Sequence, residues 1–168
     1  MTLRQILTEP NKILREKSLL VEKVDKDIQK LMDDMLETMY AGGGVGLAAT
    51  QVNIHKRLVV VDVSEEKNDP LILLNPEVEI LNFEKKKMYA EGCLSVPGFY
   101  EEIERPNTIK IKATSIEGKK MNLKAEGMKS VVLQHEIDHL DGKMFVDFLS
   151  NIKRQRIRQK LLKLKKKK

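Results

Sequence analysis

The feature that most constrains this chain is a pair of histidines four residues apart. His135 and His139 flank Glu136 within the segment 134–140. An α-helix turns about 100° per residue, so both imidazoles lie on one face and can bind a single divalent metal ion. Glu136 lies one residue further round the helix and can direct its carboxylate at a water bound to that metal. The alternative, a surface helix with incidental histidines, explains poorly why two of only three histidines have this spacing.

The residues around this pair predict a helix that is buried on two sides. One apolar stripe shares the histidine face and comprises Met128, Val131 and Val132, whereas a second lies nearly opposite and comprises Leu133, Ile137 and Leu140. An amphipathic surface helix has only one such stripe. We therefore expect the metal site to lie in a largely apolar wall that excludes solvent.

Length, cysteine content and the N-terminus indicate the kind of protein. A chain of 168 residues is long enough for one domain with a sizeable core. Its single cysteine, Cys93, cannot form an intramolecular disulfide, which is typical of a reducing compartment. The N-terminus carries Arg4 and Glu9 without the apolar segment of a signal peptide, and no apolar run approaches the ~20 residues of a membrane span. We expect a cytoplasmic protein.

The positive charge is concentrated at the C-terminus. The formal net charge is +6, yet residues 153–168 hold ten Lys or Arg and no acid, which leaves 21 basic against 25 acidic residues elsewhere. This difference in charge divides the chain into a catalytic domain over 1–150 and a basic segment over 151–168. Ile157, Leu161 and Leu164 have helical spacing, so we predict that the basic segment is a helix whose last four lysines fray. The tail is either a solvated aid to solubility or a binding segment for a polyanion; charge alone leaves ribosomal RNA and an anionic membrane equally open.

Strands precede the metal helix without alternating with other helices. Asp25 is an expected N-cap for a helix that ends at Gly42, and Gly127 is expected to open the metal helix. Strands are predicted at 58–63, 71–74, 78–83, 99–104, 108–116 and 120–125, with Asn75-Pro76 separating the second from the third. This order predicts an α+β fold with antiparallel or mixed sheets around the central HExxH helix, followed by the basic helix.

A catalytic metal of this kind takes three protein ligands and keeps one open position. No Glu occurs in residues 140–168, and Asp141 and Asp147 follow the helix too closely, so the third ligand should come from upstream. His55, several carboxylates and Cys93 remain. A lone cysteine is usually a small core residue. Beside two metal-ligating histidines, however, the Cys93 thiolate becomes the leading candidate.

Three segments resemble, in order and spacing, the motifs of peptide deformylases: Gly44–Gln51, Glu91–Ser95 and Gln134–Leu140. The likeness extends from about residue 3 to 150. It implies an α+β hydrolase that removes the formyl group from the initiator methionine of nascent chains. It further implies that Cys93, His135 and His139 hold the metal, which is Fe²⁺ in many bacterial members and is often replaced by Zn²⁺, Ni²⁺ or Co²⁺. Glu136 would be the general acid/base, and Gln51 with the Leu94 N–H would bind the formyl oxygen.

The substrate-binding residues follow from the same resemblance and from the helix face. Extended backbone at Gly44–Gly46 and Gly98–Tyr100 could pair with the peptide main chain. An apolar pocket for methionine would comprise Val45, Tyr89, Met128, Val131 and Val132. Tyr100 stands where some members carry Arg, and Tyr89 stands where a smaller aliphatic residue is common.

The basic helix is similar to that of bacterial members in which it is implicated in ribosome docking. We therefore expect a ribosome partner besides N-formylmethionyl peptides, and neither a membrane nor a DNA partner. Two other functions compete with a deformylase. HExxH alone would also support a peptidase, and a ribosome-associated protein with a structural metal is the non-catalytic alternative; Glu136 argues against the latter, because a structural site does not need it.

Overall fold

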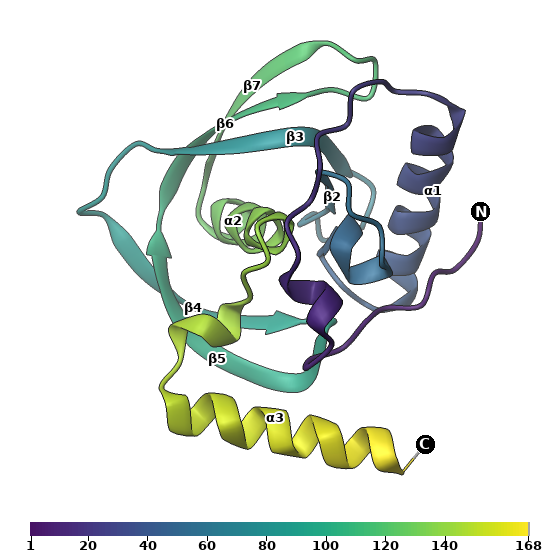
Figure 1. The fold of residues 1–168 in the computed structure, drawn as a ribbon. Coiled ribbons are helices and arrows are strands. Elements are labelled where there is room, and N and C mark those ends of the chain that lie inside the picture. Colours follow the sequence, from purple (N-terminus) through teal and green to yellow (C-terminus); the bar gives the residue numbers. More distant parts are fainter. Residues whose placement is uncertain (168) are drawn as a thin grey trace.

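The computed structural model describes residues 1–167, which form a mixed α+β fold with two antiparallel sheets and three α-helices (Figure 1). One helix, α2 (Met128–Leu140), lies at the centre, and strands surround it. A second, α1 (Lys26–Ala41), covers the sheet beside β2, and the third, α3 (Asn151–Lys166), lies below the hairpin β4–β5. The α+β expectation is thus confirmed.

The larger sheet has five strands in the order β1–β2–β3–β6–β7, and every neighbouring pair is antiparallel. Their bounds are β1 Gly46–Ala48, β2 Leu58–Val61, β3 Leu71–Ile80, β6 Thr108–Thr114 and β7 Lys120–Glu126. The smaller sheet pairs β4 (Lys86–Cys93) with β5 (Val96–Pro106). Short 3₁₀ helices, η1 (Lys12–Arg15), η2 (Ala49–Val52) and η3 (Phe145–Phe148), connect these elements.

Strand β2 separates two parts of the hydrophobic core. Successive side chains of a strand point to opposite faces. Leu58 and Val60 accordingly pack in the cluster that contains the buried face of α1, whereas Val59 and Val61 pack in the cluster that contains α2. All four side chains are buried. The period-two alternation of one short strand thus links the two helices into a single body.

The boundaries of α1 and α2 agree with their capping residues. The Asp25 side chain accepts a hydrogen bond from the Ile28 N–H at 2.9 Å, and Gly42 caps the C-terminal end of α1. Gly127, with φ of 65°, precedes α2. The predicted burial of α2 on two sides is confirmed for most of the helix: Leu133, Ile137 and Leu140 pack against the five-stranded sheet, and Val131, His135 and His139 are buried on the other side. It is wrong for Met128 of the histidine face, which is 53% exposed.

The prediction of two strands at 71–74 and 78–83 is wrong, because β3 runs without interruption from Leu71 to Ile80. Asn75 adopts a left-handed conformation with φ of 50°, and the register to β6 shifts between Leu74 and Glu77. The Asn75 side chain accepts from the Val21 N–H and donates to the Val21 carbonyl, both at 2.8 Å. The Asn-Pro pair therefore makes a bulge inside a strand rather than a turn between strands.

Strand β4 was not predicted, because none of the strands expected from the sequence covers residues 86–93. The structure places Cys93 at the end of a strand whose partner is β5, with the turn confined to two residues before Val96. The Lys86-Lys87 start of β4 is exposed and has weak strand propensity, so only pairing with β5 defines the element.

Helix α3 packs on the body. The Ser150 side chain caps it by accepting from the Lys153 N–H at 3.3 Å. Of the three apolar residues with helical spacing, Ile157 and Leu161 are buried in a cluster with Phe145 and Ile103, and only Leu164 is exposed. They therefore offer no free apolar stripe to a partner. The expected fraying of the last four lysines is wrong for Lys165 and Lys166, which are helical, while Lys168 lies outside the described residues.

Within residues 1–167, no helix has both the length and the apolar character needed to cross a membrane.

Candidate metal centre and active site

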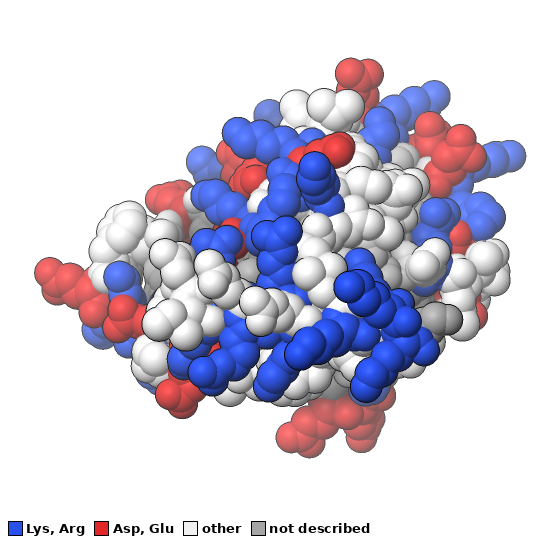
Figure 2. All heavy atoms as spheres, turned by 60° about the horizontal axis from the view of Figure 1, so that its bottom comes forward, with Lys and Arg blue, Asp and Glu red and all other residues white. Residues whose placement is uncertain are grey.

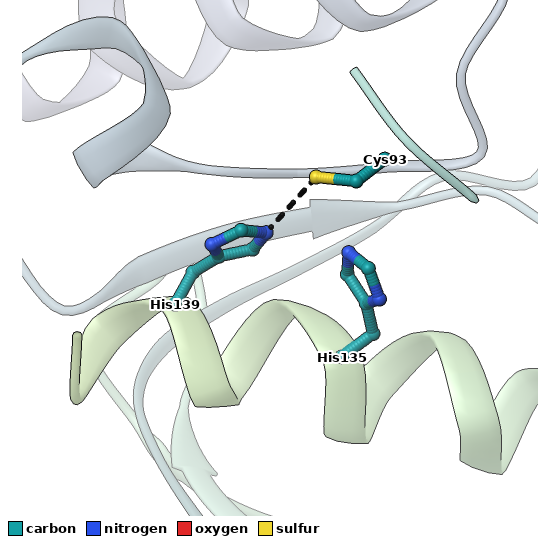
Figure 3. A group of neighbouring side chains, drawn as sticks. All are labelled: Cys93, His135 and His139. Carbon is teal, nitrogen blue, oxygen red and sulfur yellow. Dashed lines mark hydrogen bonds between the residues drawn. The ribbon is translucent and has the colours of Figure 1, made fainter. Parts of the chain in front are cut away.

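Three side chains from two distant segments meet beside the central helix (Figure 3). Cys93 comes from the end of β4, and His135 and His139 come from consecutive turns of α2. Their ligand atoms all lie within 4.8 Å of one another, and Cys93 Sγ is 3.3 Å from His139 Nε2. His55, the other histidine considered as a ligand, instead lies 3.3 Å from Glu16.

The donor set fits a divalent transition metal. One sulfur and two imidazole nitrogens are ligands that zinc and iron accept. Burial lowers the pKa of His139 well below its usual value, so its imidazole is neutral, as metal ligation requires. Burial also acts to lower the pKa of His135, but its contacts with Cys93 and Glu91 outweigh burial and raise that pKa, so a metal would displace a proton from this ring on binding.

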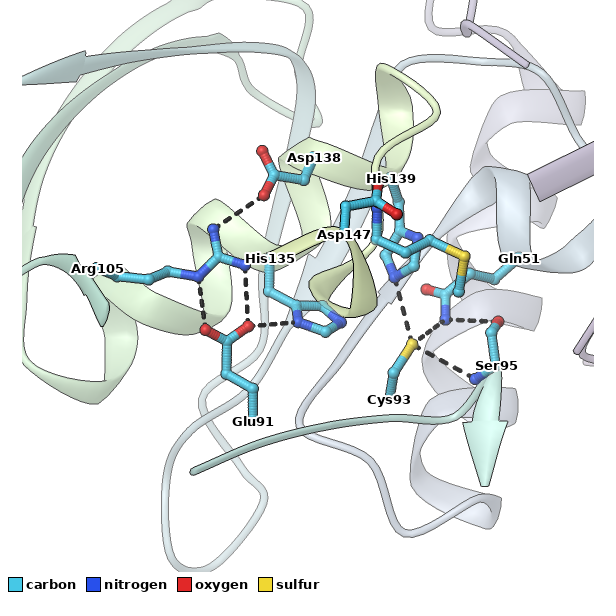
Figure 4. A network of polar contacts seen from close by, with 10 residues as sticks. Gln51, Glu91, Cys93, Ser95, Arg105, His135, Asp138, His139 and Asp147 are labelled. Atoms are coloured by element: carbon cyan, nitrogen blue, oxygen red, sulfur yellow. Dashed lines mark hydrogen bonds and ion pairs between the residues drawn. The ribbon is translucent and has the colours of Figure 1, made fainter. Parts of the chain in front are cut away.

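A buried network orients His135 (Figure 4). Its Nδ1 lies 2.9 Å from Glu91 Oε1, which leaves Nε2 available on the other side of the ring. Arg105 in turn donates to both Glu91 oxygens, at 2.6 and 2.9 Å, and to Asp138 Oδ2 at 2.9 Å. Burial raises the pKa of Glu91, but the hydrogen bonds from His135 and Arg105 outweigh it and hold that pKa below its usual value. Glu91 is thus an anion held in one orientation.

Glu91 and Arg105 were not among the predicted site residues. Glu91 lies two positions before Cys93, and residues two apart in a strand share a face. Had β4 been predicted, this alternation would have placed the Glu91 carboxylate beside the metal ligands. Arg105 gives no such local signal, because only the pairing of β4 with β5 brings it to Glu91.

Glu136 is 5% exposed and borders the cavity described below. Its Oε2 atom has no hydrogen-bond partner among residues 1–167. Burial raises the pKa of Glu136 to about 7; Glu91 and Asp138 also raise it, whereas His135 and Arg105 act in the opposite direction. A carboxyl group with this pKa can both accept and release a proton near neutral pH.

Gln51 lies next to the thiol but does not line the cavity. Its side-chain oxygen accepts from the Ala48 N–H at 2.9 Å, and its Nε2 donates to Ser95 Oγ at 3.0 Å and lies 3.4 Å from Cys93 Sγ. The side chain is 1% exposed and is absent from the cavity wall. The structure therefore brings the Gln51 amide to Cys93 and Ser95, with its oxygen bonded to the Ala48 N–H.

A cavity of about 540 Å³ opens beside the three ligand candidates. Its wall includes Cys93, Leu94, His135 and Glu136. All the residues expected to bind substrate also line it: Gly44, Val45, Gly46, Tyr89, Gly98, Tyr100, Met128, Val131 and Val132. Phe99 and Pro97 also line the cavity and were not singled out in the sequence. A largely apolar cavity with a few converging polar groups is the usual form of a substrate site.

A HExxH helix at such a cavity, with a thiol beside its two histidines, is typical of metal-dependent hydrolases. Residues 3–155 match the family model for polypeptide deformylase. The peptide deformylase of Azotobacter vinelandii is 55% identical over 161 residues, which are 96% of this chain and 95% of that protein. That of Cellvibrio japonicus is 54% identical over the same shares of the two chains.

Solved structures of peptide deformylases are also similar to this chain. A peptide deformylase from Ehrlichia chaffeensis in complex with actinonin has a TM-score of 0.93 and 43% identity, covering 97% of this chain and 98% of that one. The Legionella pneumophila enzyme has a TM-score of 0.91 and 42% identity, covering 98% and 96%. The chain therefore belongs to the polypeptide deformylase family. It is a hydrolase, and the reaction of its family is removal of the N-formyl group from nascent peptides.

Proposed function

We propose that this protein removes the formyl group from the initiator formyl-methionine of nascent chains and releases formate, using a metal held by Cys93, His135 and His139. The observation that carries the proposal is the meeting of these three side chains beside a cavity that Cys93, His135 and Glu136 border. A divalent ion bound there supplies a Lewis acid that polarises the formyl oxygen and makes water nucleophilic near neutral pH. We propose Fe²⁺ as the native ion, with Zn²⁺, Ni²⁺ or Co²⁺ as replacements.

Glu136 is the proton carrier in this proposal. Its carboxylate takes a proton from the attacking water and delivers it to the leaving amine, for which a pKa of about 7 is well matched. The Leu94 N–H and the Gln51 amide donate hydrogen bonds to the oxyanion as its charge develops. The Gln51 amide nitrogen carries two N–H donors; one is used by Ser95 Oγ, so the second makes this bond.

The cavity wall supports the expected mode of substrate binding. Strand β1 lies at the edge of the five-stranded sheet, so an extended peptide can pair with the backbone at 44–46, and the extended backbone at 98–100 in β5 can pair from another side. The methionine side chain fits the apolar group Val45, Tyr89, Met128, Val131 and Val132. The Tyr89 hydroxyl, 3.4 Å from Asn107 Oδ1, narrows this pocket.

Product analysis tests the proposal. The metal-loaded protein is incubated with formyl-Met peptides, and free formate and peptide fragments are both measured. We expect stoichiometric formate with every peptide bond intact. Internal cleavage without formate would favour a peptidase, and no product would favour the non-catalytic alternative. Since the Ehrlichia relative binds actinonin, this compound should also inhibit formate release here.

Ribosome docking through α3 is a second proposal, and it assigns catalysis to 1–150 and docking to 151–168. Lys and Arg side chains gather over α3 (Figure 2), where Arg156 and Lys163 are exposed. Deleting the helix would remove the buried Ile157 and Leu161, so charge reversal is the better test. We expect Arg156→Glu with Lys163→Glu to abolish salt-sensitive cosedimentation with ribosomes, and Lys124→Glu on β7 to leave it intact. Equal cosedimentation of both variants would reject docking.

Formylated chains emerge from ribosomes in the cytoplasm, so this is the compartment in which we propose that the protein works. DNA and membranes have no place in this proposal.

A further inference from the structure

Gly46, the first residue of β1, lies against the carboxylate of Glu136. A Cβ atom added to Gly46 would lie 2.5 Å from Glu136 Oε1 and 2.8 Å from both Cδ and Cγ. Non-bonded heavy atoms are most stable at about 3.5–4.0 Å, so any side chain at this position would collide with the carboxylate. The space that a methyl group would need at Gly46 is therefore already filled by Glu136.

Backbone conformation does not explain the glycine at this position. The glycines with positive φ in the described residues are Gly43, Gly98, Gly118, Gly127 and Gly142. Gly46 is outside this group and pairs with Val61 in a regular antiparallel ladder, a conformation that any residue adopts. The requirement for glycine is thus one of space.

Neither backbone can easily move to relieve such a collision. Strand β1 is held by its pairing with β2, and the Asp62 N–H donates to the Val45 carbonyl at 2.9 Å just before it. Helix α2 is held by Leu133, Ile137 and Leu140 in the core. The Glu136 side chain is the part that can rotate, because its Oε2 has no hydrogen-bond partner among residues 1–167. An added methyl group would therefore move the carboxylate rather than the helix or the strand.

We propose that Gly46 is a positioning residue that keeps the Glu136 carboxylate at its working place beside the cavity. This inference rests on the proposed function, in which Glu136 carries the proton. The segment 44–46 then has two roles. Its backbone contacts the peptide, and the absence of a side chain at Gly46 leaves room for the Glu136 carboxylate. The three heavy atoms nearest to the added Cβ all belong to Glu136, so this carboxylate, rather than a metal ligand, is the first group to be displaced.

The test is a double-mutant cycle of Gly46→Ala with Glu136→Gln. We expect Gly46→Ala to lower kcat by about 10²-fold with KM for a formyl-Met peptide and bound metal close to wild type. In the Glu136→Gln background the same substitution should change the residual kcat by less than about twofold, because no proton transfer remains to be disturbed. A methyl group that blocked the peptide would instead raise KM and act equally in both backgrounds, which would overturn the inference.

A shorter carboxylate provides a rescue experiment. Glu136→Asp withdraws the carboxylate by one methylene group and should make room for the added methyl. We expect Glu136→Asp to be much less harmful in the Gly46→Ala background than in wild type; an equal loss in both would contradict the steric argument. Gly118→Ala is the matched control, since it adds the same methyl group outside the cavity wall, where the Cβ would meet only a Val24 methyl carbon at 3.9 Å. Its kcat should stay within about twofold of wild type.

Failures of the two proposals are distinguishable. If Glu136→Gln kept normal kcat with bound metal, the role of Glu136 would be wrong, whatever Gly46→Ala did. If Glu136→Gln were inactive and Gly46→Ala fully active, only the positioning role of Gly46 would be rejected. Metal content and thermal unfolding of each variant identify any loss of activity that comes from a loss of fold.

Discussion

Helices α2 and α3 are both rich in ionisable residues, but the structure uses them in opposite ways. In α2 the side chains of His135, Glu136 and His139 are buried, and His135 is held by Glu91. In the described part of α3 only Ile157 and Leu161 are buried, while its basic residues point outward or lie at the rim. One helix places charge inside the protein, and the other keeps charge in water.

This difference shows what burial does to an ionisable side chain. Removal from water raises the pKa of Glu136 to about 7, so the group can exchange a proton at neutral pH. Charges on α3 keep their hydration and act mainly through their summed field, which salt screens over about 10 Å. Single substitutions should therefore have large effects in α2 and small ones on the exposed face of α3.

The largest effect should follow Glu136→Gln, which keeps the shape of the side chain and removes its proton chemistry. We expect formate release to fall by about 10²–10⁴-fold while the metal remains bound. Lys163→Gln removes one charge from the exposed face of α3 and is the matched control, with kcat expected within about twofold of wild type. Steady-state kinetics and metal analysis of both variants measure this difference. Near-normal turnover of metal-loaded Glu136→Gln would contradict the expected contrast between buried α2 and exposed α3.

Leu161→Ala should show that α3 also has a buried side. Leu161 is 3% exposed within a core cluster, whereas Leu164, three residues further on, is 52% exposed. Truncation of a buried leucine costs about 2–5 kcal/mol of the free energy of unfolding, and Leu164→Ala should cost less than about 0.5 kcal/mol. Denaturant titration measures both. Equal values would mean that α3 does not pack on the body in solution.

Glu91→Gln tests whether the buried network supports the metal ligand. Loss of the anion beside His135 Nδ1 should weaken metal binding by about 10–100-fold, as for other partners of metal-ligating histidines. Glu101→Gln is a close control, because Glu101 lies opposite Glu91 in the β4–β5 register but pairs with Lys153 of α3. Competition with a chelator gives both affinities. Unchanged affinity in Glu91→Gln would remove its supporting role.

The smallest effect should follow Lys153→Met, which breaks the exposed ion pair between Lys153 Nζ and Glu101 Oε2 at 3.0 Å. Exposed ion pairs contribute about 0–1 kcal/mol to stability, and salt weakens them further. We expect a change in the free energy of unfolding below about 1 kcal/mol at low salt and none at high salt. A loss above about 2 kcal/mol would show that α3 depends on charge as strongly as α2 does.

The sequence by itself determined the features that depend on neighbouring residues. Asp25, Gly42 and Gly127 mark helix ends because capping involves backbone groups within one turn. The spacing of His135, Glu136 and His139 predicted a metal-binding helix face because helical geometry relates residues four apart without any other part of the fold. The two apolar stripes likewise predicted that α2 would be buried on both sides.

Only the tertiary structure decided which distant segments meet. Pairing of β4 with β5 brings Arg105 to Glu91 and thereby fixes His135, and no local pattern encodes that pairing. The bulge at Asn75 depends on hydrogen bonds to Val21, 54 residues away, so the local Asn-Pro signal was misread as a turn. The spacing of Ile157 and Leu161 is compatible with either a buried or an exposed helix face. In the structure both side chains are buried in the cluster that contains Phe145. Removing their apolar area from water stabilises the packing of α3 on the body.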